Sequence, residues 1–244
     1  LEPDLKTSSR MFEFVYKMFG EGYAAVPKAG IEAIPKQLFR NLKNTTFNFN
    51  TKVASLNGSE IMLEDGTKLE SLFTIVATDA SNLIPNLKMN SIKWKPCHVL
   101  YFETKSRVIR RKLIGLIAEK ESLINNIFYA TSLKTTTQTK KELLSVTIVD
   151  DKNLTHDLLI KRVKCELKKY CGIHYDKFIK HYHFPMALPN LVDLQYNMAP
   201  LETCLAPNTF LAGDTQLNGS LNAAMISGET AALGVIKSWS NAIQ

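Results

Sequence analysis

The sequence of residues 210–232 is FLAGDTQLNGSLNAAMISGETAA, and this stretch indicates the fold. It predicts a short buried strand over 210–214, a turn with Asn218-Gly219, and a helix from Ser220 to about Trp239. Small residues in the helix would let its backbone lie close to a sheet or a ligand. They form two rows at i, i+4 spacing: Ala223, Ser227 and Ala231, beside Ala224, Gly228 and Ala232.

The junction between this strand and this helix is a candidate ligand site. Gly213-Asp214 ends the strand, and the helix begins at Ser220. Backbone N–H donors and the positive end of a helix dipole gather at such a junction, which suits an anionic or electron-rich group. A helix of small residues that simply packs on a sheet has the same pattern, so the residues alone leave both interpretations open.

Upstream, the sequence predicts two helices followed by a small antiparallel meander. Apolar residues recur at helical spacing over 8–19 and again over 34–44. Short strands are expected at 46–49, 53–56 and 61–63, with turns at Asn57-Gly58 and Asp65-Gly66. The apolar run at 72–77 then has the profile of a parallel strand that is covered on both faces.

The middle of the chain predicts a second, mixed sheet. A basic amphipathic helix is expected over 154–171, and the polar stretch 134–141 predicts a loop. The expected strands lie near 99–103, 113–118, 124–130, 143–149 and 178–184. The predicted fold is therefore α/β, with a nucleotide-type domain interrupted by an inserted α+β domain.

Composition narrows the classes of function. The 244 residues are 45% hydrophobic, yet no run approaches the roughly 18 apolar residues that a membrane span needs. The net charge is +7, but the basic runs lack interleaved aromatic residues, so solvated helix faces are favoured over nucleic-acid binding. The four cysteines have no paired spacing, which predicts core thiols of a reducing compartment and a cytoplasmic protein.

Two histidine-containing pairs could suggest a metal site. His181-x-His183 would place two imidazoles on one face of a strand, and Cys97-His98 adds further possible ligands. No third ligand stands at a recognisable spacing, so we predict no metal. Motifs of serine hydrolases and nucleoside triphosphatases are absent from the sequence.

The string from Leu211 to Ala232 resembles the C-terminal flavin-binding motif of FAD-dependent amine oxidases, phytoene desaturases and their relatives. The resemblance extends over nearly the whole chain. It includes the Pro-containing stretch Tyr23–Pro35, the strand end at Ile75–Thr78, and Phe184–Pro189, which resembles the family's return from the substrate domain to the flavin domain.

The resemblance implies FAD as cofactor and assigns residues to it. Asp214 would accept a hydrogen bond from a flavin side-chain or ribityl hydroxyl, and Gly213 would leave room for that chain. Backbone N–H groups at the helix start would face the N1 and C2 carbonyl edge of the flavin, where negative charge accumulates on reduction. The other implied positions are Val53 at the adenine, Ala77 and Thr78 near the ribose and phosphates, and Ser220, Leu221, Asn222 and Ala223 at the helix start.

One family feature is missing from the sequence. A complete member has a Gly-x-Gly-x-x-Gly loop after its first strand, with an acidic residue about 20 residues further on. Here Gly20-x-Gly22-x-x-Ala25 follows a predicted helix instead. We therefore expect the C-terminal part of a flavoprotein, completed in cis or in trans by an N-terminal FAD-binding segment. Its expected parts are a helical lead-in at 1–19, a partial Rossmann-like FAD-binding domain at 20–85 and 205–244, and an inserted substrate-binding domain at 86–204.

The function implied by the resemblance is C–H oxidation by hydride transfer to flavin. The substrate would be a small hydrophobic molecule or an amine, and the isolated chain is expected to be inactive. Neither the substrate nor a catalytic acid or base is indicated by the residues. The alternative is a non-catalytic, flavoprotein-like binding or scaffold module, which flavin absorbance of the completed protein would distinguish.

Overall fold

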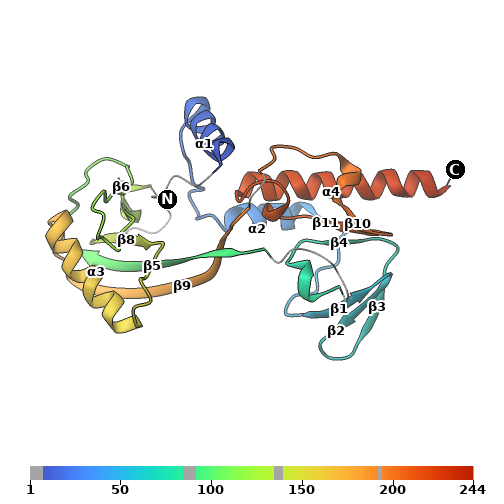
Figure 1. Ribbon diagram of the computed structural model, residues 1–244, viewed down its shortest axis with the longest axis horizontal. Helices are drawn as coiled ribbons and strands as arrows, with labels where there is room; N and C mark the ends of the chain where they lie inside the picture. Colours follow the sequence, from blue (N-terminus) through green and yellow to red (C-terminus); the bar gives the residue numbers. More distant parts are fainter. Residues whose placement is uncertain (1–7, 85–91, 135–139, 192–193, 244) are drawn as a thin grey trace. The chain divides into compact units, whose positions relative to one another are not determined.

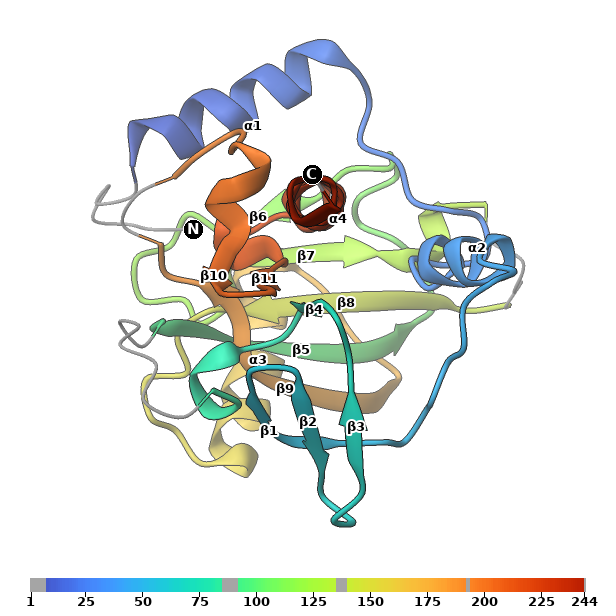
Figure 2. The same cartoon turned by 90° about the vertical axis from the view of Figure 1, so that its right-hand side faces the viewer.

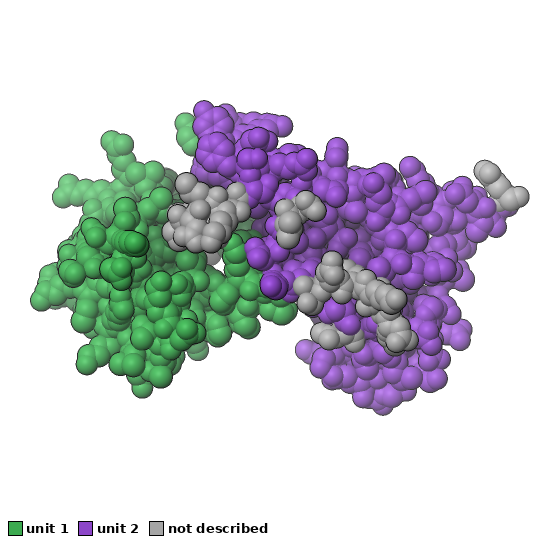
Figure 3. Space-filling model, in the orientation of Figure 1, with its two compact units in different colours: residues 1–5, 22–43, 94–188 green, residues 6–21, 44–93, 189–244 purple. Residues whose placement is uncertain are grey.

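The computed structural model describes residues 8–84, 92–134, 140–191 and 194–243. Within these ranges the chain forms two compact units (Figure 3). Unit 1 comprises Gly22–Lys43 and Trp94–Leu188, and unit 2 comprises the other described residues. The chain is α/β with several sheets, as predicted. The division into four parts at 19/20, 85/86 and 204/205 remains a prediction.

A small sheet in unit 2 joins segments that are far apart in the sequence (Figure 1). β11 is parallel to β4, with Leu211 opposite Val76, whereas β10 is antiparallel to β11. The runs predicted as strands at 72–77 and 210–214 are therefore neighbours in one sheet. The order is β10-β11-β4, with β4 at Thr74–Val76, β10 at Cys204–Ala206 and β11 at Thr209–Leu211.

β4 is shorter and less covered than the sequence predicts. Val76 packs in a buried cluster with Leu56, Ala80 and Leu211, but the side chain of Ile75, on the other face, is 40% exposed. The expectation of a strand covered on both faces is therefore wrong for the described residues. An apolar run shows that a strand has hydrophobic surface on both sides, but it does not specify that one chain covers both.

α4 (Leu221–Ile243) packs one of its two rows of small residues into unit 2. Ala223, Ser227 and Ala231 are buried, and Ala231 shares a cluster with Phe210 of β11. In the second row, Ala232 is exposed, and a Cβ added at Gly228 would meet no described atom within 4 Å. The close approach that the small residues predicted is therefore made by the first row.

An antiparallel meander completes unit 2, and Figure 2 shows its strands side by side. The predicted turns form after β1 and after β2, with positive φ at Gly58 and Gly66. The strand expected at 46–49 is wrong: this segment is irregular, and Phe47 stacks on Phe49 at 5.9 Å between ring centroids. The strands are β1 at Val53–Asn57, β2 at Glu60–Leu63 and β3 at Lys68–Glu70.

Both predicted N-terminal helices are present. α1 (Ser9–Glu21) is held within unit 2 by the Arg10 guanidinium, which donates to the Leu194 carbonyl at 2.9 Å. α2 (Ala33–Asn41) belongs to unit 1, and Pro35 lies in its first turn, where a missing N–H costs little. Short 3-10 helices connect other elements: η1 at Ala80–Asn82, η2 at Ala130–Ser132, η3 at Pro200–Thr203 and η4 at Asp214–Gln216.

Unit 1 is built on a five-stranded sheet with α3 (His156–Cys171) on one face (Figure 1). Leu159, Val163 and Leu167 of the helix pack into one buried cluster with Leu100 and Phe102 of the sheet. The strand order is β6-β7-β8-β5-β9, with β5 at Trp94–Thr104, β6 at Gly115–Leu116, β7 at Asn126–Tyr129, β8 at Glu142–Ile148 and β9 at Lys177–Pro189.

The sheet of unit 1 is antiparallel, so the predicted mixed sheet is wrong for the described strands. The pairs β5–β8, β7–β8 and β6–β7 are antiparallel. Two backbone hydrogen bonds show that β9 runs antiparallel to β5. The Asp176 N–H, before β9, donates to the Glu103 carbonyl near the end of β5, and the Asn190 N–H, after β9, donates to the Lys93 carbonyl before β5. A strand, helix, strand order such as that of β8, α3 and β9 is typical of a parallel pair. β8 and β9 do run in the same direction, but β5 lies between them.

Three further sequence expectations concern the cysteines, the loop at 134–141 and membrane spans. All four cysteines are free. The prediction of core thiols is wrong for Cys165 and Cys204, which are exposed, whereas Cys97 is half-buried and Cys171 packs against the buried cluster of unit 1. Most of the loop predicted at 134–141 lies outside the described residues. None of the described helices has the length and apolar character needed to cross a bilayer.

At Gly234 the backbone of α4 packs closely against Pro200 and Phe210. A Cβ at this position would lie 2.5 Å from the Pro200 carbonyl oxygen and 3.0 Å from the Phe210 ring. We expect Gly234→Ala to lower the free energy of unfolding by about 1–3 kcal/mol in a urea titration.

Gly228→Ala is the matched control, because it adds the same methyl group to the same helix in open space. We expect it to raise stability by about 0.5–1 kcal/mol through helix propensity. Equal effects of the two substitutions would contradict the close packing at Gly234.

Candidate functional site

The carboxyl ends of β4 and β11 meet at one edge of the small sheet in unit 2. Because the strands are parallel, Ala77-Thr78 and Gly213-Asp214 leave the sheet at neighbouring positions. The Ala212 N–H donates to the Val76 carbonyl at 2.9 Å and continues the pairing to this edge. The structure thus brings together four of the residues predicted from sequence.

Ser227 holds the turn after β11 against α4. The Gly213 N–H donates to Ser227 Oγ at 2.8 Å. The hydroxyl itself lies 2.9 Å from the carbonyl oxygens of Gly213 and Ala224, either of which can accept its proton. Gly213 has a φ of 129°, a backbone conformation in which a side chain would be strained. We call the hydrogen bonds between Ser227 and Gly213 the Ser227 clamp. The clamp fixes the turn after β11, and Gly213 leaves its backbone uncovered by a side chain at the edge of the sheet.

Ser220 caps the N-terminus of α4. Its Oγ accepts a hydrogen bond from the Ala223 N–H at 3.1 Å and donates to Asn218 Oδ1 at 2.7 Å. Asn218 is buried, and its Nδ2 donates to the Gln195 carbonyl at 3.3 Å. The start of the helix is therefore anchored at a defined position in unit 2.

The first two residues of α4 have backbone donors available for a ligand. In the part of the chain that the structure describes, the Leu221 and Asn222 N–H groups have no acceptor, and both residues are exposed. Ala223 differs, because it is buried and its N–H is bonded to Ser220. The positive end of the helix dipole adds partial positive charge at this position.

Asp214 contributes a half-buried carboxylate in the short 3-10 turn that precedes this helix. It is the first residue of η4, directly after the Gly213 turn. Among the described residues its side chain has no hydrogen-bond or ion-pair partner. A half-buried carboxylate is stabilised when water or a ligand supplies the missing donor. The edge therefore offers two N–H donors and one strong acceptor.

Val53 begins β1 in the separate meander sheet, opposite Leu63. That sheet is tied to the segment after β4 by Leu56, whose N–H donates to the Leu83 carbonyl at 2.7 Å and whose side chain packs with Val76. None of the described contacts joins Val53 itself to Thr78 or Gly213.

Sequence reasoning missed two residues that position this site. Ser227 was counted among the small residues of α4, although its hydroxyl also bonds both backbone groups of Gly213. Asn218 was assigned to a turn, although its side chain links Ser220 to Gln195. The role of Ser227 had one signal in the sequence: it lies on the row of α4 that was expected to pack closely, and a buried hydroxyl requires a hydrogen-bond partner.

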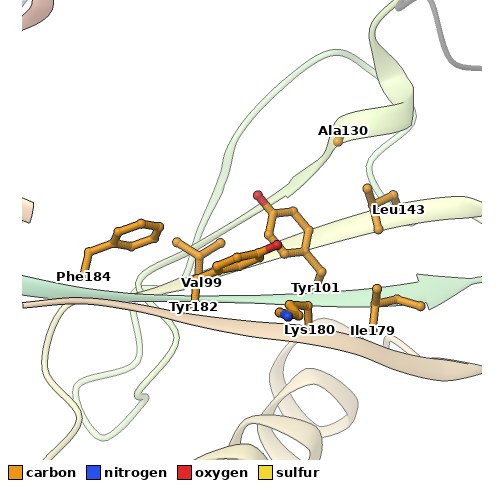
Figure 4. Close-up of a pocket in the computed structure, with 8 residues that line it drawn as sticks. All are labelled: Val99, Tyr101, Ala130, Leu143, Ile179, Lys180, Tyr182 and Phe184. Atoms are coloured by element: carbon orange, nitrogen blue, oxygen red, sulfur yellow. The ribbon is translucent and has the colours of Figure 1, made fainter. Parts of the chain in front are cut away.

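A pocket in unit 1 lies on the face of the sheet opposite α3. Its volume is about 560 Å³, and Figure 4 shows that most of its labelled side chains stand on one side of β5 and β9. On β5, Val99 and Tyr101 point away from the cluster that Leu100 and Phe102 form with α3. The lining residues are Val99, Tyr101, Ala130, Leu143, Ile179, Lys180, Tyr182 and Phe184.

Four of the five histidines in the sequence gather elsewhere in unit 1. His98 Nδ1 lies 2.9 Å from His181 Nε2, and the His98 ring stacks on His183 at 4.2 Å between centroids. The His156 ring lies 4.9 Å from His181, and Asp151 Oδ2 lies 3.3 Å from His98 Nε2. No three histidine, cysteine or acidic side chains of the described residues are arranged to hold a metal ion.

The two central histidines of this cluster favour the neutral form. Burial lowers the pKa of His98, and the neighbouring His183 lowers it further, although the Asp151 carboxylate opposes the shift. Burial also lowers the pKa of His181, with additional contributions from His98, His156 and His183. His98 and His181 therefore resist protonation in the folded chain.

A family comparison identifies the class of protein. The model of the flavin-containing amine oxidoreductases matches residues 2–236. The chain belongs to the flavin-containing amine oxidoreductase family. The prediction from the motif at 211–232 is confirmed at this level, and the cofactor of this family is a flavin.

Several solved structures share this fold at low sequence identity. An oxidoreductase from Methanosarcina mazei has 14% identity and a TM-score of 0.66, over 94% of this chain and 58% of its own. A proposed protoporphyrinogen oxidase from Exiguobacterium has 11% identity and a TM-score of 0.65, over 86% and 51%. A redesigned putrescine oxidase has 12% identity and a TM-score of 0.59, over 85% and 53%.

The family member described here spans about half the length of these solved structures. No curated protein matches its sequence significantly. At these identities, the structural likeness shows the fold alone.

The histidine cluster generates a prediction for the pH dependence of stability. Because the pKa values of His98 and His181 are lowered from the ordinary 6.5, the unfolded chain binds protons first as the pH falls. Stability contributed by the neutral cluster is therefore present above pH 6.5 and is lost progressively below it. We expect the free energy of unfolding to fall between pH 7.5 and pH 5.0, and to fall less in His98→Gln.

His174→Gln is the control for this measurement, since His174 is exposed and is the histidine outside the cluster. It should keep the pH dependence of the unmodified chain. An equal loss of stability on acidification in His98→Gln and in His174→Gln would contradict the account.

Proposed function

We propose that the chain is the C-terminal part of an FAD-dependent oxidoreductase whose flavin is held at the β4–β11 edge and the start of α4. The observation that supports this most strongly is the set of groups at that junction. Leu221 and Asn222 have N–H groups without acceptors among the described residues, and the Asp214 carboxylate, in the turn before the helix, has no donor there. Membership of a flavin-containing family supplies the class of ligand.

The chemistry of these groups fits a flavin with a ribityl chain. The N1 and C2 carbonyl edge of a flavin has acceptors for the Leu221 and Asn222 N–H groups, and a ribityl or flavin side-chain hydroxyl is a donor for Asp214. Gly213 presents no side chain at the turn between them. We assign Ala77 and Thr78, which are exposed after β4, to the ribose and phosphates, and Val53 to the adenine.

When bound, FAD supplies the acceptor for a hydride taken from a C–H bond of the substrate. The residues of this chain contribute the electrostatics of that step. The helix N-terminus and its N–H groups stabilise negative charge that develops beside them, and the donors are held in place before reaction by the Ser220 cap and the Ser227 clamp. We assign no acid or base.

An N-terminal FAD-binding segment, in cis or in trans, completes the protein in this proposal. α4 supports it, because the helix leaves several large apolar side chains exposed on the side that faces away from unit 2. Exposed apolar side chains gathered on one element are typical of a surface that another part of a protein covers. Its exposed large side chains include Leu221, Met225, Ile226, Leu233, Ile236 and Ile243.

We assign substrate binding to the region 86–204, which contains the pocket of unit 1. The size of the pocket and its apolar lining are typical of small-molecule sites.

An FAD titration tests the proposal as a whole. Flavin fluorescence would be followed for the chain alone and for the chain with an upstream segment supplied. We expect binding that is strong only in the extended protein, because the chain lacks a phosphate-binding glycine loop. No binding by either protein would favour a scaffold module over a flavoenzyme.

Asp214→Ala tests the assigned site. We expect it to weaken FAD binding to the completed protein by roughly 1.5–3 kcal/mol, the range for a hydrogen bond to a charged group. Glu229→Ala is the control, because it removes an exposed carboxylate from α4 without touching the turn. Unchanged FAD affinity in Asp214→Ala would exclude the assignment.

A further inference from the structure

The pocket of unit 1 is a small aromatic surface. Tyr101 and Tyr182 meet edge to face at 6.0 Å between ring centroids, and Phe184 stacks on Tyr182 at 6.2 Å. Ile179, Tyr182 and Phe184 are each more than 40% exposed. Apolar side chains left exposed in a concave site gain free energy when an apolar ligand covers them.

A break in the alternation of β9 places a cation beside these rings. Phe178 packs on Phe102 in the core that includes α3, and His181 contacts His98 on the same face. Ile179 and Tyr182 instead line the pocket on the opposite face. Lys180 is therefore the extra residue that shifts the strand by one position, as in a β-bulge.

Lys180 provides positive charge at the pocket without a competing carboxylate. Its Nζ lies 5.6 Å from the centroid of the Tyr182 ring. No aspartate or glutamate is among the described residues that line the pocket. Beyond Tyr101 on the same face of β5 comes Glu103, whose carboxylate is bonded to Lys141.

The segment that contains the pocket residues has a positive net charge, like Lys180 itself. The segment 94–188 contains 18 lysines and arginines against 9 aspartates and glutamates, so it accounts for the entire positive excess of the chain. A surface with this balance raises the local concentration of anions and lowers that of cations.

We propose that this pocket binds an apolar molecule with a carboxylate, placing its body on the aromatic side chains and its carboxylate at Lys180. A cationic amine is disfavoured, because its ammonium group would meet the Lys180 ammonium without an acidic partner. The inference rests on the proposed function in one respect: it names the substrate class of the unit to which we assign substrate binding.

Three probes with the same apolar chain test the proposal: octanoate, octylamine and 1-octanol. Each would be titrated into the 244-residue chain by calorimetry at pH 7.5 and low ionic strength. We expect octanoate to bind roughly fivefold tighter than 1-octanol and roughly tenfold tighter than octylamine, as for one exposed ion pair. Octylamine binding as tightly as octanoate, or no binding of any probe, would overturn the proposal.

Variants of Lys180 separate charge from packing. We expect Lys180→Met to abolish the preference for octanoate over 1-octanol, Lys180→Arg to keep it, and Lys180→Glu to favour octylamine. Lys177→Met is the control, because it removes an exposed lysine from the same strand outside the pocket. A preference that survives in Lys180→Met would overturn the assignment.

These titrations and the FAD titration have independent outcomes. Octanoate binding at Lys180 in a protein that never binds FAD would remove the proposed function and leave this site standing as a binding site. FAD binding in a protein whose pocket prefers octylamine would overturn the present inference alone.

Discussion

The parallel pairing of β4 with β11 is the interaction on which the candidate site depends. It brings two segments from distant parts of the sequence into one sheet and sets their carboxyl ends at the same edge. The Ala212 N–H extends the pairing to the Val76 carbonyl, so the next residue on each strand already lies in the site. If β11 paired one residue out of register, Gly213 and Asp214 would be displaced along the edge.

Two serines fix the backbone between β11 and the start of α4. Ser227, buried on the inward row of α4, bonds the N–H of Gly213 and can return its own proton to the same residue. At the other end of the turn, the Ser220 cap is anchored by Asn218. Preorganised donors of this kind act without further reorganisation, which is why they are effective at developing negative charge.

The sequence predicted much of this site because its signals are local. The strand, turn and helix at 210–232 require only an apolar run, a glycine and a helix of small residues. The role of Ser227 could not be predicted, because its hydroxyl bonds a residue fourteen positions earlier along the chain. The choice between the two rows of small residues also depended on what lies beside α4, since Ala231 of the buried row packs with Phe210.

The sequence predictions failed in unit 1 where a feature depends on segments that are distant in the sequence. The order strand, helix, strand at β8, α3 and β9 is that of a parallel pair, but whether the two strands are adjacent depends on β5, which comes earlier in the sequence. The pocket was likewise not predicted, because Lys180 meets the aromatic rings only through a shift in strand alternation that no local pattern specifies. Tertiary pairing decided each of these features.

Hydrogen–deuterium exchange on the completed protein, with and without FAD, tests the central claim most directly. The account predicts that FAD slows exchange in the segment 213–223, with the largest change at the Leu221 and Asn222 amides, which have no acceptor among the described residues. Saturating FAD that leaves exchange at these amides unchanged would contradict it.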